Sequence, residues 1–216
     1  MKRLVTVVTG GSRGIGAATC RRLAEDGHDV VVGYGGDVDA AEAEEVAEGV
    51  RRSGARAVRV QADTSVEADV ERLFTLAAKE LGPVTGLVNN AGVTVSSARL
   101  ADTDPADLRR AVEVNLLGTL LCSRRAARVM TARGNGVIVN VMPCTADPGD
   151  VVHHVVTKAA VDALTQSLAG ELGPDGIRVN AVEPGNTEEV AAAIAWLMSP
   201  DASYATGTVI RMTGGR

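Results

Sequence analysis

Short apolar runs alternate with amphipathic segments from one end of the chain to the other. The apolar runs predict strands at residues 4–8, 28–33, 57–61, 86–89, 136–141, 177–182 and 208–212. Between them, the residue pattern predicts helices over residues 17–26, 40–52, 67–81, 105–131, 151–172 and 188–198. Strands separated by helices of this length need right-handed crossovers, so the pattern predicts a parallel sheet with helices on both faces.

The turn between the first strand and the first helix is rich in glycine. Residues 9–16 read Thr-Gly-Gly-Ser-Arg-Gly-Ile-Gly, and these glycines let the backbone turn sharply into the helix that follows. A helix N-terminus that faces such a turn offers free N–H groups and a partial positive charge. The stretch therefore predicts a site for a pyrophosphate.

Composition and charge narrow the class of protein. The chain has 216 residues, of which 45% are hydrophobic, and this length favours one domain over residues 1–216. Its net charge is −5 and its arginine pairs are spread over several predicted helices, which is typical of solvated faces and not of a nucleic-acid groove. No apolar run approaches a membrane span, and the N-terminus enters the first strand directly, so we expect a cytoplasmic protein that binds neither nucleic acid nor a membrane. The three cysteines are scattered, which favours reduced thiols over disulfides or a metal cluster.

Further motifs follow the glycine-rich turn along the chain. They are Asp63 after the third strand, Asn89-Asn90-Ala91-Gly92 after the fourth, Asn115 in Val-Asn-Leu-Leu-Gly, Lys158, Val179-Asn180-Ala181-Val182 with Pro184-Gly185, and Ala202-Ser203-Tyr204-Ala205-Thr206-Gly207. Together they resemble the short-chain dehydrogenase/reductase family over essentially the whole chain, and most closely its bacterial 3-oxoacyl-(acyl-carrier-protein) reductase type. The resemblance implies a single α/β domain with a doubly wound, Rossmann-type parallel sheet that binds a nicotinamide dinucleotide across the carboxyl ends of its strands.

The resemblance also implies which residues hold the dinucleotide. They are Gly10, Ser12, Arg13, Ile15 and Gly16 at the phosphates, Asp63 and Thr64 at the adenine, Asn90, Ala91 and Gly92 on the ribose side, Lys158 at the nicotinamide ribose, and Pro184 and Gly185 after the sixth strand. The second strand ends without an acid placed to bond a ribose 2′-hydroxyl, while Arg13 can meet a 2′-phosphate. We therefore expect NADP(H) in preference to NAD(H), with Asp37 as the carboxylate that can reverse this preference and a cofactor-free protein as the remaining alternative.

Three departures from the family pattern concern its chemistry. The family places a tyrosine four residues before the lysine and a serine after the fifth strand, whereas here His154 precedes Lys158 and Pro143 falls on the serine position, beside Cys144 and Thr145. The family also carries a long helical insert after Pro-Gly, and here Gly185-Asn186-Thr187 runs straight into the glutamates of the last helix. We expect Thr187 to cap that helix.

His154 is the leading candidate for catalysis. It lies four residues before Lys158 on one helix face and near the N-terminus of that helix, and both the ammonium and the helix dipole favour a neutral imidazole. A neutral imidazole accepts a proton and is a poor donor to a ketone, which favours proton abstraction, elimination, isomerisation or cyclisation over ordinary carbonyl reduction. Cys144 either forms a Cys/His nucleophile pair with it or is a small buried side chain that only fills space. Asn115 has either a catalytic role or a structural one in its long helix.

Two other functions remain open at this point. One is an NADP-dependent reductase in which His154 or a water replaces the tyrosine hydroxyl, and the other is an inactive nucleotide-binding or partner-binding subunit. For the two enzyme alternatives, we expect a small-molecule or carrier-bound substrate. Because family members associate through the helices that correspond to residues 105–131 and 151–172, the resemblance further implies a homodimer or a homotetramer.

Overall fold

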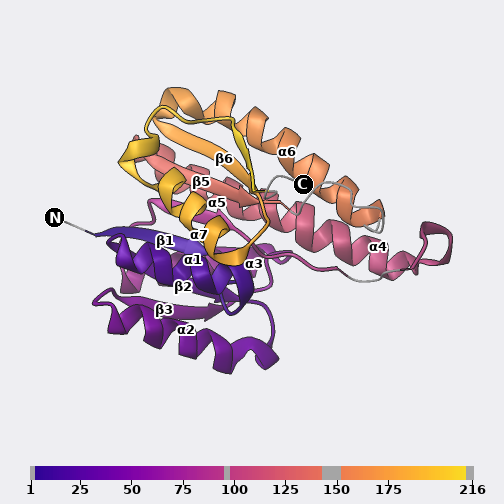
Figure 1. Cartoon of the computed structure of the whole chain (residues 1–216), viewed down its shortest axis with the longest axis horizontal. Coiled ribbons are helices and arrows are strands. Elements are labelled where there is room, and N and C mark those ends of the chain that lie inside the picture. The colour runs from indigo at the N-terminus through magenta and orange to yellow at the C-terminus, as the bar shows by residue number, and fades with distance from the viewer. Residues whose placement is uncertain (1–2, 95–97, 143–151, 213–216) are drawn as a thin grey trace.

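A seven-stranded parallel sheet forms the centre of the computed structural model, which describes residues 3–94, 98–142 and 152–212 (Figure 1). The strands lie in the order β3-β2-β1-β4-β5-β6-β7, as predicted for a doubly wound sheet. Their bounds are β1 Leu4–Val8, β2 His28–Tyr34, β3 Ala57–Gln61, β4 Gly86–Asn89, β5 Gly136–Val141, β6 Ile177–Glu183 and β7 Val209–Arg211.

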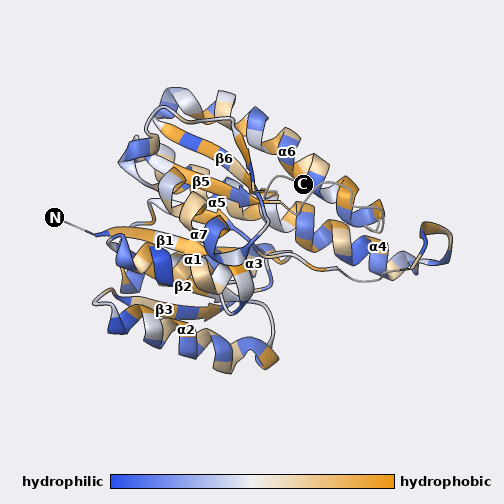
Figure 2. Ribbon diagram, viewed as in Figure 1, coloured by the Kyte–Doolittle hydropathy of each residue, from blue (hydrophilic) through white to orange (hydrophobic). Residues whose placement is uncertain are grey.

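Helices cover both faces of the sheet and bury its apolar side chains. They are α1 Gly14–Glu25, α2 Ala40–Arg52, α3 Glu67–Glu80, α4 Pro105–Val112, α5 Thr119–Thr131, α6 Val152–Leu172 and α7 Thr187–Met198. Side chains alternate across a strand, so Val7 packs with α3, α5 and α6 on one face, while Val8 packs with α1, α2 and α7 on the other. Strands buried on both faces need apolar residues at nearly every position, and Figure 2 shows β1 largely in the hydrophobic colour.

The helix predicted over residues 105–131 is continuous but not regular. A π-helical segment, Glu113–Gly118, separates α4 from α5. Such segments are rare and often lie at functional sites, and this one contains the buried Asn115. Gly118 allows the backbone to approach Thr64 closely, because a Cβ atom at Gly118 would lie 2.6 Å from the Thr64 hydroxyl. The helix begins with Asp104, whose carboxylate caps the backbone N–H of Ala106.

The connection from β6 to α7 is short. Glu183 ends β6 and Thr187 begins α7, so the chain returns into a helix without any intervening element. The cap predicted at Thr187 is wrong by one residue: the Asn186 side chain accepts the bond from the Glu188 N–H at 3.1 Å. Short 3-10 helices occur at Asp37–Asp39, Leu100–Asp102, Gly173–Asp175 and Pro200–Ala202.

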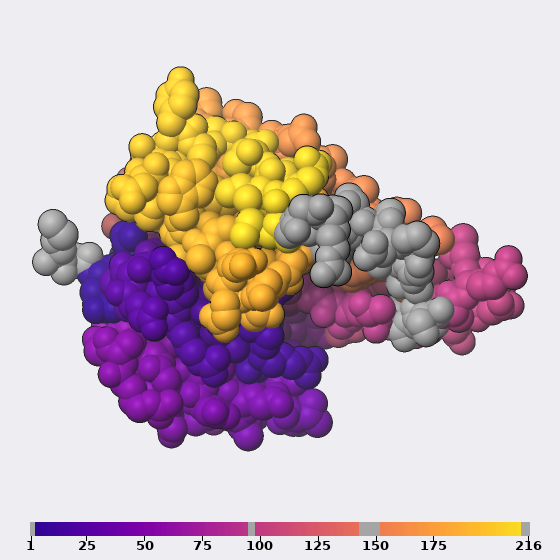
Figure 3. Space-filling view, in the orientation of Figure 1, coloured from indigo at the N-terminus to yellow at the C-terminus, as the bar shows by residue number. Residues whose placement is uncertain are grey.

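One end of the molecule projects beyond the sheet. The segment that contains α4 extends away from the strands in Figure 1 and forms a protrusion in the space-filling view of Figure 3. Among the described residues, no helix is both long and apolar enough to cross a membrane.

Candidate functional site

A cleft of about 490 Å³ opens at the carboxyl ends of β1 to β4. The glycine-rich turn forms one wall, and the segments that follow β2, β3 and β4 form the others. This is the edge at which open parallel sheets bind their ligands. The predicted residues that line it are Gly10, Ser12, Arg13, Ile15, Asp63, Thr64, Asn90, Ala91 and Gly92. Nine candidates from three separate parts of the sequence thus surround one cavity.

Hydrogen bonds between two motifs hold the glycine-rich turn in shape. The Asn90 amide donates to the carbonyls of Thr9 and Gly10 at 3.1 and 2.9 Å. The Thr9 hydroxyl in return accepts from the backbone N–H groups of Asn90 and Ala91, both at 3.0 Å. Gly16 lies directly behind the turn, where a Cβ atom would collide with the carbonyl of Gly10 and stand 2.6 Å from the Asn90 amide nitrogen. The tight packing explains why the turn needs glycine there.

The turn and the helix behind it suit a phosphate group. Gly10 and Gly14 have φ angles of +63° and +52°, in the left-handed region that glycine adopts without strain. The helix α1 begins at Gly14, so its first backbone N–H groups and its positive dipole end face the cleft. A diphosphate therefore fits this part of the cleft.

Asp63 and Thr64 lie at the other end of the cleft. Asp63 accepts bonds from the Ser65 hydroxyl at 2.6 Å and from Arg110 at 2.9 Å. Partial burial opposes ionisation, but these bonds outweigh it and hold the pKa of Asp63 below its ordinary value. Arg110 was not predicted. It reaches the cleft from α4, and nothing in the local sequence around it signals this position.

The cleft also contains an acid that the sequence did not single out. Asp39, in the 3-10 helix after β2, lines the cavity and pairs with the exposed guanidinium of Arg13 at 3.0 Å. The acid considered from the sequence, Asp37, instead accepts a bond from the Gln61 amide at 2.8 Å. A carboxylate therefore lies beside the predicted phosphate-binding arginine, at a position two residues later than expected.

Lys158 and Asn115 adjoin the cleft at Gly92. A Cβ atom on Gly92 would lie 3.3 Å from the Asn115 side-chain oxygen and 3.6 Å from Lys158 Nζ. Asn115 holds the loop after β4 through two bonds to the backbone of Val93, at 2.8 and 3.0 Å. The Lys158 ammonium donates to the carbonyl of Val141 at 3.2 Å, and burial lowers the pKa of Lys158 to about 8. Asn115 thus has a clear structural task, while Lys158 presents a poorly solvated charge at the cleft.

The remaining predicted residues do not line the cleft or lie outside the described residues. His154 is partly buried on α6, one turn before Lys158. Cys144 lies outside the described residues, together with Pro143 and Thr145. Pro184 and Gly185 follow β6 at the carboxyl edge but do not line the cleft, and Gly185 packs against the backbone of Met212.

Comparison with known proteins gives consistent matches over the whole chain. A profile described as short chain dehydrogenase matches residues 4–196. The chain is 35% identical to the uncharacterized oxidoreductase YgfF of Escherichia coli, covering 98% of this chain and 99% of that protein. It is 39% identical to a cis-4-hydroxycyclohexanecarboxylate dehydrogenase of Sinomonas cyclohexanicum over 98% and 95% of the two chains. It is 31% identical to the 3-oxoacyl-(acyl-carrier-protein) reductase FabG of Staphylococcus epidermidis, over 97% of each.

A solved structure agrees with these sequences. A short-chain type dehydrogenase/reductase from Mycobacterium marinum superposes with a TM-score of 0.92 at 29% identity, covering 98% of this chain and 94% of that one. The alignment with the Escherichia coli protein extends over 247 positions, more than the 216 residues of this chain. That relative therefore has residues without counterparts here, as expected for a chain that lacks an insert.

Proposed function

The chain belongs to the short-chain dehydrogenase family, and from this membership we propose that its cleft binds a nicotinamide dinucleotide, with NADP(H) favoured over NAD(H). The glycine-rich turn and the start of α1 would hold the diphosphate, and Arg13 would hold a 2′-phosphate. Lys158 would hold the ribose next to the nicotinamide. When bound, the dinucleotide supplies a hydride donor or acceptor.

The preference for NADP(H) depends on the pair of Arg13 and Asp39. Arg13 is 74% exposed, and an ion pair of such an exposed side chain contributes little, so a phosphate dianion can replace the carboxylate as its partner. Asp39 opposes this by repelling the same phosphate. Arg13 therefore favours NADP(H), and Asp39 makes this preference weaker.

We further propose that the protein does not carry out ordinary carbonyl reduction and uses the cleft for base-type chemistry. The observation that carries this proposal is a cleft lined by the glycine-rich turn, beside a helix that bears histidine, not tyrosine, one turn before Lys158. A neutral His154 imidazole can remove an acidic proton from a carbon next to a carbonyl group. The Lys158 ammonium can then stabilise the negative charge that develops on the carbonyl oxygen.

One observation favours a second function, a dinucleotide-dependent reductase. Because burial lowers the pKa of Lys158 to about 8, its ammonium is a stronger acid than an exposed lysine and can protonate an alkoxide. In that case Lys158 itself would supply the proton that the family takes from tyrosine. Relatives named as dehydrogenases and reductases agree with this alternative.

Two measurements distinguish these functions. Calorimetric titration with NADPH, NADH and their oxidised forms tests binding, and absorbance at 340 nm then follows NADPH with a panel of ketones and β-ketoesters. In parallel, NMR in ²H₂O follows exchange of the protons next to the carbonyl group of cyclohexanone. We expect NADPH binding, no NADPH oxidation, and exchange that His154→Ala abolishes and Gln166→Ala, an exposed change on the same helix, leaves intact. Steady oxidation of NADPH with a β-ketoester would overturn the base-type proposal and support the reductase.

We also propose that the protein acts as a homodimer or homotetramer on a small-molecule or carrier-bound substrate. The two long helical segments expose apolar side chains where they extend past the sheet: Val112 is 47% exposed, Leu117 41%, Val152 50% and Val156 60%. Packing of these side chains against a second copy would remove them from water. The short connection after β6 carries no helical insert, which would leave this part of the carboxyl edge open to a substrate that arrives on a carrier protein.

A further inference from the structure

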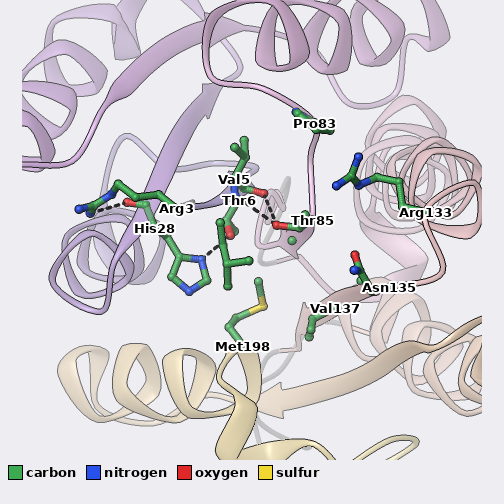
Figure 4. A pocket seen from close by; sticks show the side chains of 13 residues that line it. Arg3, Val5, Thr6, His28, Pro83, Thr85, Arg133, Asn135, Val137 and Met198 are labelled. Atoms are coloured by element: carbon green, nitrogen blue, oxygen red, sulfur yellow. Dashed lines mark hydrogen bonds between the residues drawn. The ribbon is translucent and has the colours of Figure 1, made fainter. Parts of the chain in front are cut away.

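A second cavity, of about 300 Å³, opens at the amino ends of the strands (Figure 4). Its lining comes from the starts of β1, β2, β4 and β5, from the segments that precede β4 and β5, and from Met198 at the end of α7. The amino ends of parallel strands lie at the edge of the sheet opposite to their carboxyl ends. This cavity and the cofactor cleft therefore share no residue and can be occupied independently.

Much of the wall is apolar. The residues concerned are Leu4, Val5, Pro83, Val137 and Met198. Met198 folds in because Gly86 leaves it space: a Cβ atom on Gly86 would collide with the Met198 methyl group and lie 2.5 Å from the Thr6 hydroxyl. In Figure 4 the Met198 side chain lies below His28, with Arg133 and Asn135 on the opposite side of the cavity. A ligand here would bury an apolar body between the two sides.

The charges around the cavity are all positive or neutral. Among the described residues that line it there is no aspartate or glutamate, but there are two arginines. Arg3 is already engaged, by an ion pair with Asp29 at 3.1 Å and by bonds to two backbone carbonyls. The side chains of Arg133 and Asn135 make no hydrogen bond or ion pair within the described part of the chain. One guanidinium and one amide are thus free to bind a ligand at the rim.

His28 adds a donor whose orientation is fixed. Its Nδ1 lies 2.8 Å from the Thr6 hydroxyl, and both side chains are buried. The Thr6 hydroxyl makes no other bond among the described residues, so its proton is satisfied only if it donates to Nδ1. Burial lowers the pKa of His28 and keeps the ring neutral, which places the remaining proton on Nε2. His28 therefore lines the cavity with one N–H group available for donation.

We propose that this cavity binds a small carboxylate with an apolar body, held at its charged end by Arg133 and Asn135. An arginine beside a carboxylate makes charge-assisted and often bidentate bonds, and no acid of the described lining competes for it. The volume lies at the lower limit of small-molecule sites, which fits a compact molecule such as an aromatic or short aliphatic acid. The site is independent of the proposed dinucleotide chemistry.

The methyl group of Met198 allows a direct test. The chain has five methionines, so ¹³C-methyl labelling gives a simple NMR spectrum in which Met198→Leu identifies the resonance. Benzoate is the probe, and benzyl alcohol is its uncharged counterpart. We expect benzoate to shift the Met198 resonance to saturation. We expect Arg133→Gln to weaken benzoate binding at least about tenfold, the range for loss of a charged hydrogen bond. The matched control Arg128→Gln, another exposed arginine nearby, should leave binding unchanged.

Several outcomes would overturn the proposal. One is a Met198 resonance that does not move at up to about 20 mM benzoate, since a ligand this small is expected to bind in the millimolar range. A second is that benzyl alcohol binds as tightly as benzoate. A third is that Arg133→Gln and Arg128→Gln weaken benzoate binding equally. A shift confined to Met142, which follows β5 at the opposite edge, would place the benzoate at the carboxyl edge of the sheet instead. Urea midpoints of both variants equal to that of the unmodified chain would exclude loss of folding as the cause of weaker binding.

Discussion

Replacement of Lys158 by methionine should make the protein more stable while it weakens dinucleotide binding. Burial lowers the pKa of Lys158 from 10.5 to about 8. That difference corresponds to about 3 kcal/mol of lost stability while the ammonium is charged. Methionine keeps all but one atom of the side chain's length and leaves the Val141 carbonyl without its donor, at a cost of about 1 kcal/mol. The net expectation for Lys158→Met is a gain of about 2 kcal/mol in the free energy of unfolding at pH 7.

The stability gained by Lys158→Met should decrease as the pH rises. Below pH 8 the ammonium is charged in both the folded and the unfolded chain, and its burial costs the full amount. Between about pH 8 and 10.5 the folded state has released the proton while the unfolded state keeps it, so the unmodified protein becomes more stable relative to the variant. The advantage of Lys158→Met should therefore shrink over this range. Comparing the two proteins at each pH cancels the contributions that the other titrating groups make to stability.

Urea unfolding at pH 7 and pH 10 measures the gain in stability and its dependence on pH. Calorimetric titration with NADPH measures the loss of binding. Lys79, 74% exposed beside Glu80, provides the control: Lys79→Met should change stability by less than about 0.5 kcal/mol at either pH. Loss of a charged bond to the ribose should weaken NADPH binding by about 10- to 100-fold in Lys158→Met only. A variant that is equally or less stable at pH 7, or whose advantage does not shrink with pH, would refute the reasoning.

Three further changes test the cleft and the assembly. Gly16→Ala should abolish NADPH binding in calorimetry, because the new methyl group collides with the carbonyl of Gly10. The control is Gly170→Ala, at an exposed position on α6 with open space around it. This variant should bind NADPH as before and be more stable by about 0.5–1 kcal/mol. Asp39→Asn should tighten NADPH binding and leave NADH unchanged; weaker NADH binding would instead assign this side chain to the ribose 2′-hydroxyl. Val156→Glu should shift the protein towards a monomer in light scattering, and an unchanged mass would place the interface elsewhere.

The alternation of strands and helices could be predicted from the sequence because the buried strands are short apolar runs with little ambiguity. β1, β3, β4 and β5 have the predicted bounds, β2 and β6 are one residue longer at their ends, and β7 is one residue shorter at each end. The π-helical segment around Asn115 could not be predicted in this way. It depends on the contact of Gly118 with Thr64, residues more than fifty positions apart, and on the clamp that Asn115 forms around Val93.

The cleft was predicted in part for the same reason. Gly10, Asp63 and Asn90 lie within two residues of the ends of strands, and the ends of neighbouring parallel strands meet at one edge whatever the conformation of the loops. Asp39 and Arg110 reach the cleft only through the way in which a 3-10 helix and α4 pack, and no local pattern encodes that packing. The side chains of the displaced serine position, around Pro143 and Cys144, lie outside the described residues, so that part of the site remains a sequence prediction.

The stability that the protein loses by burying the Lys158 ammonium bears on the choice between an enzyme and an inactive subunit. Folding alone does not need a buried ammonium at Lys158, and an uncharged side chain of the same length would stabilise the chain. Features that lower stability and face a cleft are expected where binding or catalysis requires them. Lys158 acquires a useful partner only when a polar ligand enters beside Gly92, since the Val141 carbonyl is the one acceptor within the described residues. The charge is therefore best explained by a ligand that bonds to it, which favours an occupied dinucleotide site over an empty one, whichever side chain moves the proton.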